Sequence, residues 1–213
     1  MTSAFDPALQ RGLDALGLPG LLIGHRVIAA GDEDALRDAE VSSLPSRVPA
    51  ARRASGAVRI VARALLAQLG HPDAQVPKGA TGQPIWPAGV VGSLAHDDEV
   101  AVAAVGLRRD FASIGIDVEP SSALPSGMLA LIATPREHRV VDGDLVRARL
   151  LFAAKEAVYK AVYPVDALFL EFSDIEVDLA AGKADTRSGR TLSLRTCVSP
   201  RIVVVAVIGA AQA

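Results

Sequence analysis

Two long helical segments, one in each half of the 213-residue chain, limit the folds that are open to this sequence. The first, Val48–Leu69, places Val58, Ala62 and Leu65 on one face and is followed by Gly70 and Pro72, which end helices. The second segment spans residues 144–163 and is closed by Pro164. Because each helix must bury an apolar face, each half of the chain needs strands or helices of its own to pack against.

Apolar segments of strand length supply these packing partners. We predict strands at residues 21–30, 90–95, 100–107, 113–118, 169–179, 191–198 and 202–208, with a turn region at residues 182–189. Shorter helices are predicted at Leu9–Leu18 and after the capping box Thr134-Pro135-Arg136-Glu137. Each half therefore has one long helix and several strands, and the halves join near residues 107–112. No sequence repeat relates them.

Composition excludes several classes of protein. The 22 basic and 24 acidic residues give a net charge of −2, which does not call for a nucleic-acid partner. One cysteine, Cys197, rules out an internal disulfide framework and a cysteine-rich zinc site. No apolar run is long enough to cross a membrane, and the first residues lack the pattern of a signal peptide, so we expect a cytoplasmic protein. P-loop, dinucleotide-binding, zincin and serine-hydrolase elbow motifs are also missing.

Asp117 and Glu119 form the first candidate site. They end an apolar strand that Pro120 stops, and their i, i+2 spacing turns both side chains to one side of the strand. Two adjacent carboxylates repel each other unless a cation lies between them, and oxygen ligands suit Mg²⁺. A solvated strand end followed by a turn is the alternative interpretation.

Glu156 and Lys160 form the second candidate site, within the apolar helix of residues 144–163. Lys155 and Glu156 introduce charge into the sequence Phe152-Ala-Ala-Lys-Glu-Ala-Val-Tyr-Lys160, and Glu156 and Lys160 lie one helical turn apart. An exposed salt bridge of small energetic value explains the same spacing.

Arg52, Arg59 and Arg63 form a third candidate. Their spacing predicts a basic stripe beside the apolar face of the first long helix, and residues 41–72 contain five arginines and no acid. Such a stripe suits a phosphate, which arginine grips through two N–H groups, although a solvated basic face fits equally well. His96, after the strand of residues 90–95, could donate to a phosphate or cap a turn.

Taken in order, these motifs resemble the 4′-phosphopantetheinyl transferases of the surfactin and enterobactin synthetase type. The resemblance is carried by Gly115-Ile-Asp-Val-Glu119, by Phe152-x-x-Lys-Glu-x-x-x-Lys160, by Lys78-Gly79 with Gly82-Gln-Pro-Ile-Trp-Pro87, by Gly92-Ser-Leu-Ala-His96 and by the arginine helix. Ser55-Gly56 departs from the Glu-Phe that is frequent in this branch, and a glycine there weakens a helix by about 1 kcal/mol.

The resemblance implies an α+β fold of two similar α/β halves, a pseudo-dimer. Each half would have a long helix packed on a small, mainly antiparallel sheet, with coenzyme A in the cleft between the halves. Residues 1–110 would form the half on the adenosine 3′-phosphate side of coenzyme A, and residues 111–213 the half with the metal and the catalytic residues. It also implies a monomer of the larger type, without a nucleic-acid or membrane partner.

The implied reaction moves the phosphopantetheine arm of coenzyme A to a serine of an apo acyl or peptidyl carrier protein and releases adenosine 3′,5′-bisphosphate. Asp117, Glu119 and Glu156 would bind Mg²⁺, or Mn²⁺ in its place. Glu156 would be the base, directly or through a water, and Lys160 would stabilise the leaving group. The cofactor-binding residues implied by the family are Arg52, Arg59, Lys78, His96 and Lys155: the first two and His96 on the 3′-phosphate, the two lysines on phosphate oxygens.

Two other classes of function remain open at this point. A magnesium-dependent phosphohydrolase acting on a nucleotide-like diphosphate would use the same carboxylates and attack with water. A non-catalytic binder of coenzyme A or of a carrier protein would keep the fold without the reaction, although the intact set of acidic residues and Lys160 argues against it.

Overall fold

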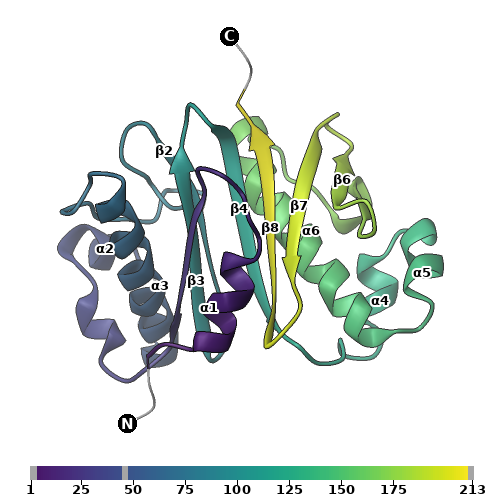
Figure 1. Cartoon of the computed structure of the whole chain (residues 1–213), viewed down its shortest axis with the longest axis horizontal. Helices are drawn as coiled ribbons and strands as arrows, with labels where there is room; N and C mark the ends of the chain where they lie inside the picture. The colour runs from purple at the N-terminus through teal and green to yellow at the C-terminus, as the bar shows by residue number, and fades with distance from the viewer. Residues whose placement is uncertain (1–3, 45–47, 211–213) are drawn as a thin grey trace.

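The computed structural model describes residues 4–44 and 48–210, and these residues form an α+β fold with two antiparallel sheets (Figure 1). Up to the turn at residues 108–110, the elements are α1 (Pro7–Asp14), β1 (Leu22–Val27), η1 (Asp32–Ala35), α2 (Asp38–Ser43), α3 (Pro49–Gln68), β2 (Val90–His96) and β3 (Val100–Leu107). After it come β4 (Phe111–Pro120), α4 (Met128–Ile132), α5 (Pro135–Val141), α6 (Leu145–Asp166), η2 (Phe172–Asp174), β5 (Ile175–Asp178), β6 (Lys183–Thr186), β7 (Thr191–Cys197) and β8 (Arg201–Gly209). Within the described ranges, none of the helices has the length and apolar character that a membrane span requires.

The two sheets connect their strands in the same way. The first sheet has the order β1-β3-β2, and the second has β4-β8-β7-β6-β5. In the first half, strand β1 precedes the long helix α3 and pairs with β3, the last strand of that half. In the second half, strand β4 precedes the long helix α6 and pairs with β8, again the last strand. The prediction of an α+β fold with small antiparallel sheets and long helices is confirmed.

A shared apolar cluster joins the two sheets. It takes residues from β2 and β3 of the first sheet and from β4 and β8 of the second. Helix α1, which lies over the central strands in Figure 1, inserts Leu9, Leu13 and Leu16 into this cluster. Two further clusters lie beneath α3 and α6, so each half also has a core of its own.

Several boundaries differ from the sequence-based predictions: α1 and β1 end earlier than expected, and three differences lie in the C-terminal half. Helix α6 continues through Pro164 to Asp166, where Ala167 ends it with a positive φ and an N–H that donates to the carbonyl of Tyr163. A proline in the last turn removes only one helical hydrogen bond, so it does not stop the helix. The strand predicted at residues 169–179 is shorter, since η2 precedes β5. The predicted turn region contains β6, whose four residues are too few for a clear alternation.

Helix α6 approaches strand β4 unusually closely, and Gly115 makes this approach possible. A Cβ atom at Gly115 would lie 1.9 Å from the carbonyl oxygen of Ala157 and 2.7 Å from the backbone nitrogen of Ala161. Ala157 and Ala161 are fully buried and carry the smallest side chains that a helix of good propensity can use. The backbones of β4 and α6 therefore meet almost without intervening side chains.

Gly56 serves the same purpose on α3. A Cβ atom there would lie 1.8 Å from the carbonyl oxygen of Asp32 in η1. Helix α3 is continuous through Ser55-Gly56, so the expected weakening does not interrupt it. The departure from the family pattern at this position is explained by the close packing of η1.

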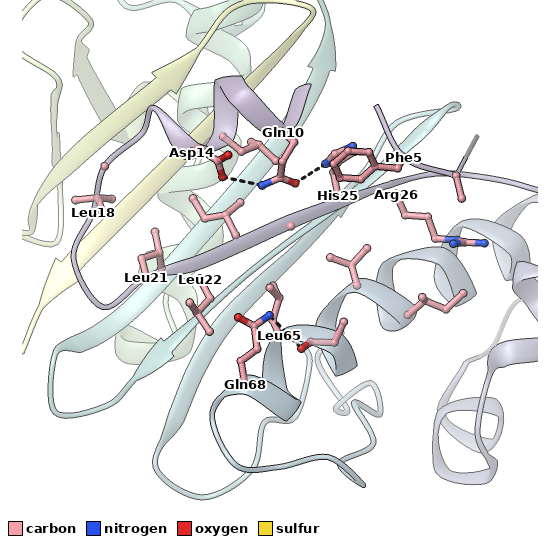
Figure 2. A pocket seen from close by; sticks show the side chains of 18 of the residues that line it. Phe5, Gln10, Asp14, Leu18, Leu21, Leu22, His25, Arg26, Leu65 and Gln68 are labelled. Atoms are coloured by element: carbon pink, nitrogen blue, oxygen red, sulfur yellow. Dashed lines mark hydrogen bonds between the residues drawn. The ribbon is translucent and has the colours of Figure 1, made fainter. Parts of the chain in front are cut away.

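A groove of about 920 Å³ lies between α1, β1 and α3 and contains a buried histidine (Figure 2). The Nε2 atom of His25 accepts a hydrogen bond from the backbone N–H of Asp6 at 2.9 Å, which leaves Nδ1 as the donor to Gln10 Oε1 at 3.1 Å. The amide of Gln10 donates in turn to Asp14 at 2.8 Å. Burial lowers the pKa of His25, against the opposing charges of Asp6 and Asp14. The neutral ring thus holds the start of α1 on β1.

We predict that Gly115→Ala destabilises the protein by about 1–3 kcal/mol. The added methyl group meets backbone atoms of α6, which cannot move without the helix. Urea unfolding measures this change. Gly209→Ala is the matched control, since a Cβ there meets nothing within 4 Å. Equal stability of the two variants would contradict the close packing of α6 on β4.

We predict that His25 makes the protein less stable as the pH falls below the ordinary histidine pKa of 6.5. The unfolded chain takes up a proton in this range while the buried ring resists it, so the free energy of unfolding decreases until the lowered pKa of the folded state is reached. Urea unfolding at pH 7.5 and 5.5 should show a smaller pH dependence for His25→Gln than for wild type. The exposed His138→Gln serves as control and should keep the wild-type pH dependence.

Candidate active site

The carboxylates of β4 and the charged residues of α6 face each other across the contact at Gly115. Asp117 pairs with Lys160, with Oδ1 and Nζ 2.6 Å apart, and Glu119 pairs with Arg149, with Oε2 and Nη1 also 2.6 Å apart. Asp117 and Glu119 thus point to the same side of β4, as strand alternation predicts. Gly115 lets the backbones of β4 and α6 approach closely. The side chains of Asp117 and Glu119, which come after Gly115 in β4, therefore lie close to charged side chains of α6.

Asp117 is left with an unused oxygen in a buried position. Its side chain is only 9% exposed, and Oδ2 has no hydrogen-bond partner among the described residues. Burial raises the pKa of Asp117, the negative charge of Glu156 raises it further, and the ammonium group of Lys160 opposes both effects. A buried carboxylate oxygen without a partner is costly, so this site favours an added cation.

Glu119 and Glu156 differ in their surroundings. Arg149 holds Glu119 and also donates to the carbonyls of Ser122 and Ala123, which fixes the chain after β4. Burial raises the pKa of Glu119, and the hydrogen bond from Arg149 opposes this. Glu156 is half-buried and forms no ion pair with any residue in the described ranges, so its carboxylate is available.

The three carboxylates are not arranged as a finished metal site. Within residues 4–44 and 48–210, no three His, Cys, Asp or Glu side chains are grouped closely enough to hold an ion. Asp117 forms an ion pair with Lys160, and Glu119 forms one with Arg149. A cation that binds both carboxylates would have to replace part of these ion pairs. The donor set of oxygen atoms and the unpartnered Oδ2 of Asp117 fit a hard divalent cation.

A cavity of about 1150 Å³ lies between the two halves and is lined by residues of both. Lys160, whose ammonium group contacts Asp117, is one of the lining residues. Trp86 and Ser93 line it from the N-terminal half, and Tyr159 and Tyr163 from α6. The tyrosine rings lie 5.6 Å apart, and Tyr159 also contacts Phe169 edge-on. Aromatic rings therefore form one wall of the cavity, and Lys160 adds a charged group to its lining.

These cavity residues were not assigned a role from the sequence. Trp86 and Ser93 occur in the motifs that carry the family resemblance, but nothing local indicates that they face a cavity. Tyr159 and Tyr163 have an i, i+4 spacing that places them on one helix face, which was the available signal.

Lys155 does not belong to this site, which corrects the expectation that it holds phosphate oxygens. Its side chain is fully buried, and Nζ lies 2.6 Å from Glu137 Oε2 and 2.8 Å from the carbonyl oxygen of Phe172. Glu137 also accepts hydrogen bonds from the backbone N–H groups of Thr134 and Val177. Burial lowers the pKa of Lys155, and Glu137 opposes the shift. Lys155 therefore fastens α6 to α5 and β5, out of reach of a ligand.

Arg59 is also removed from the predicted phosphate-binding set. It is 4% exposed, and it donates to the carbonyls of Val76 and Ser55 at 2.8 and 3.1 Å. Arg63 pairs with the buried Glu40 at 2.7 Å. The predicted basic stripe is therefore wrong for these two residues, because their guanidinium groups hold η1, α2 and the chain near Val76 on α3.

The remaining basic candidates stay accessible. Arg52 is half-buried and has no ion pair with a described residue, and the side chain of Lys78 is exposed in the loop before β2. His96 is exposed at the end of β2, where Nδ1 lies 3.3 Å from the carbonyl oxygen of Asp97. These three residues are free to contact an anion at the N-terminal half.

Two family models match most of this chain. A family model described as the 4′-phosphopantetheinyl transferase N-terminal domain matches residues 39–106, and the model of the 4′-phosphopantetheinyl transferase superfamily matches residues 113–205. The chain is 42% identical over 156 residues to the 4′-phosphopantetheinyl transferase Npt of Nocardia iowensis, covering 71% of this chain and 70% of that protein.

Two further relatives show similar identity. The 4′-phosphopantetheinyl transferase Svp of Streptomyces mobaraensis is 41% identical over 70% of this chain, and PptT of Mycobacterium tuberculosis is 44% identical over 56% of it. The matched regions span 63% and 55% of these two proteins, less than two thirds of either. The two family models and the Nocardia relative establish that the chain belongs to the 4′-phosphopantetheinyl transferase superfamily.

Proposed function

We propose that this chain transfers the 4′-phosphopantetheine arm of coenzyme A to a serine of an apo carrier protein and releases adenosine 3′,5′-bisphosphate, using the site between β4 and α6. One observation carries the proposal: Lys160 contacts Asp117 and also lines the large cavity. Lys160 thus links Asp117 to the cavity, and we expect a diphosphate to lie at this charged end while the arm extends along the aromatic wall.

Asp117, Glu119 and Glu156 would hold a divalent cation, Mg²⁺ or Mn²⁺. The fit rests on the unpartnered Oδ2 of Asp117 and on the all-oxygen donor set. When bound, such a cation neutralises the negative charge of a diphosphate.

The protein's own residues supply the remaining functions of the site. Glu156 has no ion pair with a described residue, so it is available to take the proton of the carrier serine, directly or through a water. Lys160 lines the cavity, and its ammonium group would stabilise the charge that develops on the departing phosphate. Arg149 keeps Glu119 in place by pairing with it and with the chain after β4.

Coenzyme A would bind across the two halves of the chain. The apolar wall formed by Trp86, Tyr159 and Tyr163 suits the pantetheine arm. Arg52 and His96, which are accessible at the N-terminal half, would hold the 3′-phosphate of the adenosine, and the exposed Lys78 would hold phosphate oxygens. This retains the assignment of residues 1–110 to the adenosine side and of residues 111–213 to the metal and catalytic residues. The protein would act as a cytoplasmic monomer without a nucleic-acid partner.

The transfer reaction can be tested by incubating the protein with coenzyme A, Mg²⁺ and a panel of apo acyl and peptidyl carrier proteins, followed by mass spectrometry. We expect one phosphopantetheine group to be added to the carrier serine. Consumption of coenzyme A without a carrier would indicate a phosphohydrolase, and binding without either change would indicate a non-catalytic binder.

We predict that Asp117→Asn abolishes this transfer while the protein stays folded. The substitution keeps the shape of the side chain but removes the charge that a cation needs. Burial penalises the charge of Asp117 more than any other effect, so removing that charge relieves a cost that offsets the lost pair with Lys160, and the melting temperature without Mg²⁺ should change little. Turnover close to wild type, or transfer that persists in excess EDTA, would disprove the role of the carboxylates.

We predict that substitution of Lys160 impairs catalysis, whereas substitution of Lys155 impairs stability. Lys160→Ala should lower kcat about 100-fold or more, because a donor to developing charge is lost. Lys155→Met should instead lower the free energy of unfolding by about 3–5 kcal/mol, since it leaves Glu137 as an unpaired buried charge. Kinetics and urea unfolding of both variants separate these effects. An unchanged kcat in Lys160→Ala would show that Lys160 only forms a structural ion pair with Asp117.

A further inference from the structure

Arg201 connects the two halves of the molecule beside the carboxylates. It is the first residue of β8 and lies in register with Pro120, the residue that follows Glu119 in β4. Its Nη1 atom donates to Asp97 Oδ2 at 2.8 Å, and Nη2 donates to Glu99. Because Asp97 and Glu99 belong to the turn between β2 and β3, this contact ties the N-terminal half to the end of β4 that bears the acidic residues.

Asp97 uses both of its carboxylate oxygens to fix this turn. Oδ1 accepts hydrogen bonds from the backbone N–H groups of Glu99 and Val100, each at 2.7 Å, and so holds the turn in shape. Oδ2 receives Arg201 from the other half. The side chains of Asp97 and Arg201 are 10% and 16% exposed, whereas that of Glu99 is 73% exposed. Solvent and salt therefore screen the Asp97–Arg201 pair less than an ordinary surface ion pair.

His96 directly precedes Asp97 and depends on the same turn. Its ring is exposed, and its recorded hydrogen-bond contact within the described residues is with the carbonyl oxygen of Asp97, at 3.3 Å. The ladder between β2 and β3 fixes the backbone of His96, which lies in register with Ala101, and the contact with the carbonyl of Asp97 orients the exposed ring. A ligand that spans the two halves needs the distance between His96 and the β4 carboxylates to be fixed before binding.

We propose that Arg201 is a positioning residue that, by holding Asp97, sets His96 against the β4 carboxylates and so determines the affinity for the 3′-phosphate of coenzyme A. The inference rests on the proposed function, in which His96 contacts that phosphate. Arg201 itself contacts the turn and takes no part in the reaction.

Direct binding tests this role without requiring the transfer reaction. Isothermal titration calorimetry would compare adenosine 3′,5′-bisphosphate with 5′-AMP, which lacks the 3′-phosphate. We expect Arg201→Gln and Asp97→Asn to weaken binding of the bisphosphate roughly tenfold and to leave binding of 5′-AMP within about twofold of wild type. Asp97→Asn keeps the Oδ1 acceptor that shapes the turn, so it removes the link to Arg201 without opening the turn.

Arg187→Gln is the matched control. It removes an arginine that pairs with Asp174 at 3.3 Å within the C-terminal half, and it should bind both ligands as wild type does. Thermal melting of each variant checks the fold. If Arg201→Gln does not fold, Arg201→Lys, which keeps the charge but offers a single ammonium group to two acceptors, is compared together with Asp97→Asn.

Three results would overturn the proposal: unchanged binding of the bisphosphate in the folded variants, equal losses for both ligands, or no preference of the wild type for the bisphosphate. A wild type that prefers the bisphosphate but modifies no carrier protein would contradict the proposed function and would leave the role of Arg201 supported by the binding data.

Discussion

The close contact between the backbones of β4 and α6 at Gly115 is the interaction on which the site depends. A Cβ at this position would lie 1.9 Å from the carbonyl oxygen of Ala157, so no residue other than glycine fits without a shift of the helix. Two residues further along β4, Asp117 meets Lys160 at 2.6 Å. The glycine of the Gly-Ile-Asp-Val-Glu motif and the alanines of α6 thus create the short distance that lets a strand carboxylate and a helix ammonium group share one site.

Burial separates the structural charges from the available ones. Lys155, Arg59 and Glu40 are almost fully withdrawn from water, and each has its partners within the protein. A buried charge of this kind must be paired, because leaving it alone costs several kcal/mol. Glu156, Arg52 and His96 keep accessible groups and have no ion pair with another described residue, so they can bind a ligand at little cost to the fold. The same division explains why neighbours in sequence, Lys155 and Glu156, serve different purposes.

The two halves cooperate at the site through contacts that are distant in sequence. A shared apolar cluster beneath α1 holds the sheets together, and Arg201 reaches the turn after β2 from the start of β8. The large cavity lies between the halves, with Trp86 on one side and Tyr159 on the other. Neither half alone would enclose a ligand in this way, so the arrangement of the halves is itself a functional property.

The sequence by itself determined the long helices, most of the strands and the family, because helical periodicity, alternation and motif spacing are local properties. It also placed Asp117 and Glu119 on one side of a strand that ends at Pro120. It did not determine which charged side chains face solvent. Arg59 and Lys155 carry the same local signals as Arg52 and Lys160, and only the packing of the chain near Val76 on α3 and of α5 and β5 on α6 buries them. The tertiary structure alone decided this division, since the burial of a charge depends on the elements that cover it and on the partner they bring to it.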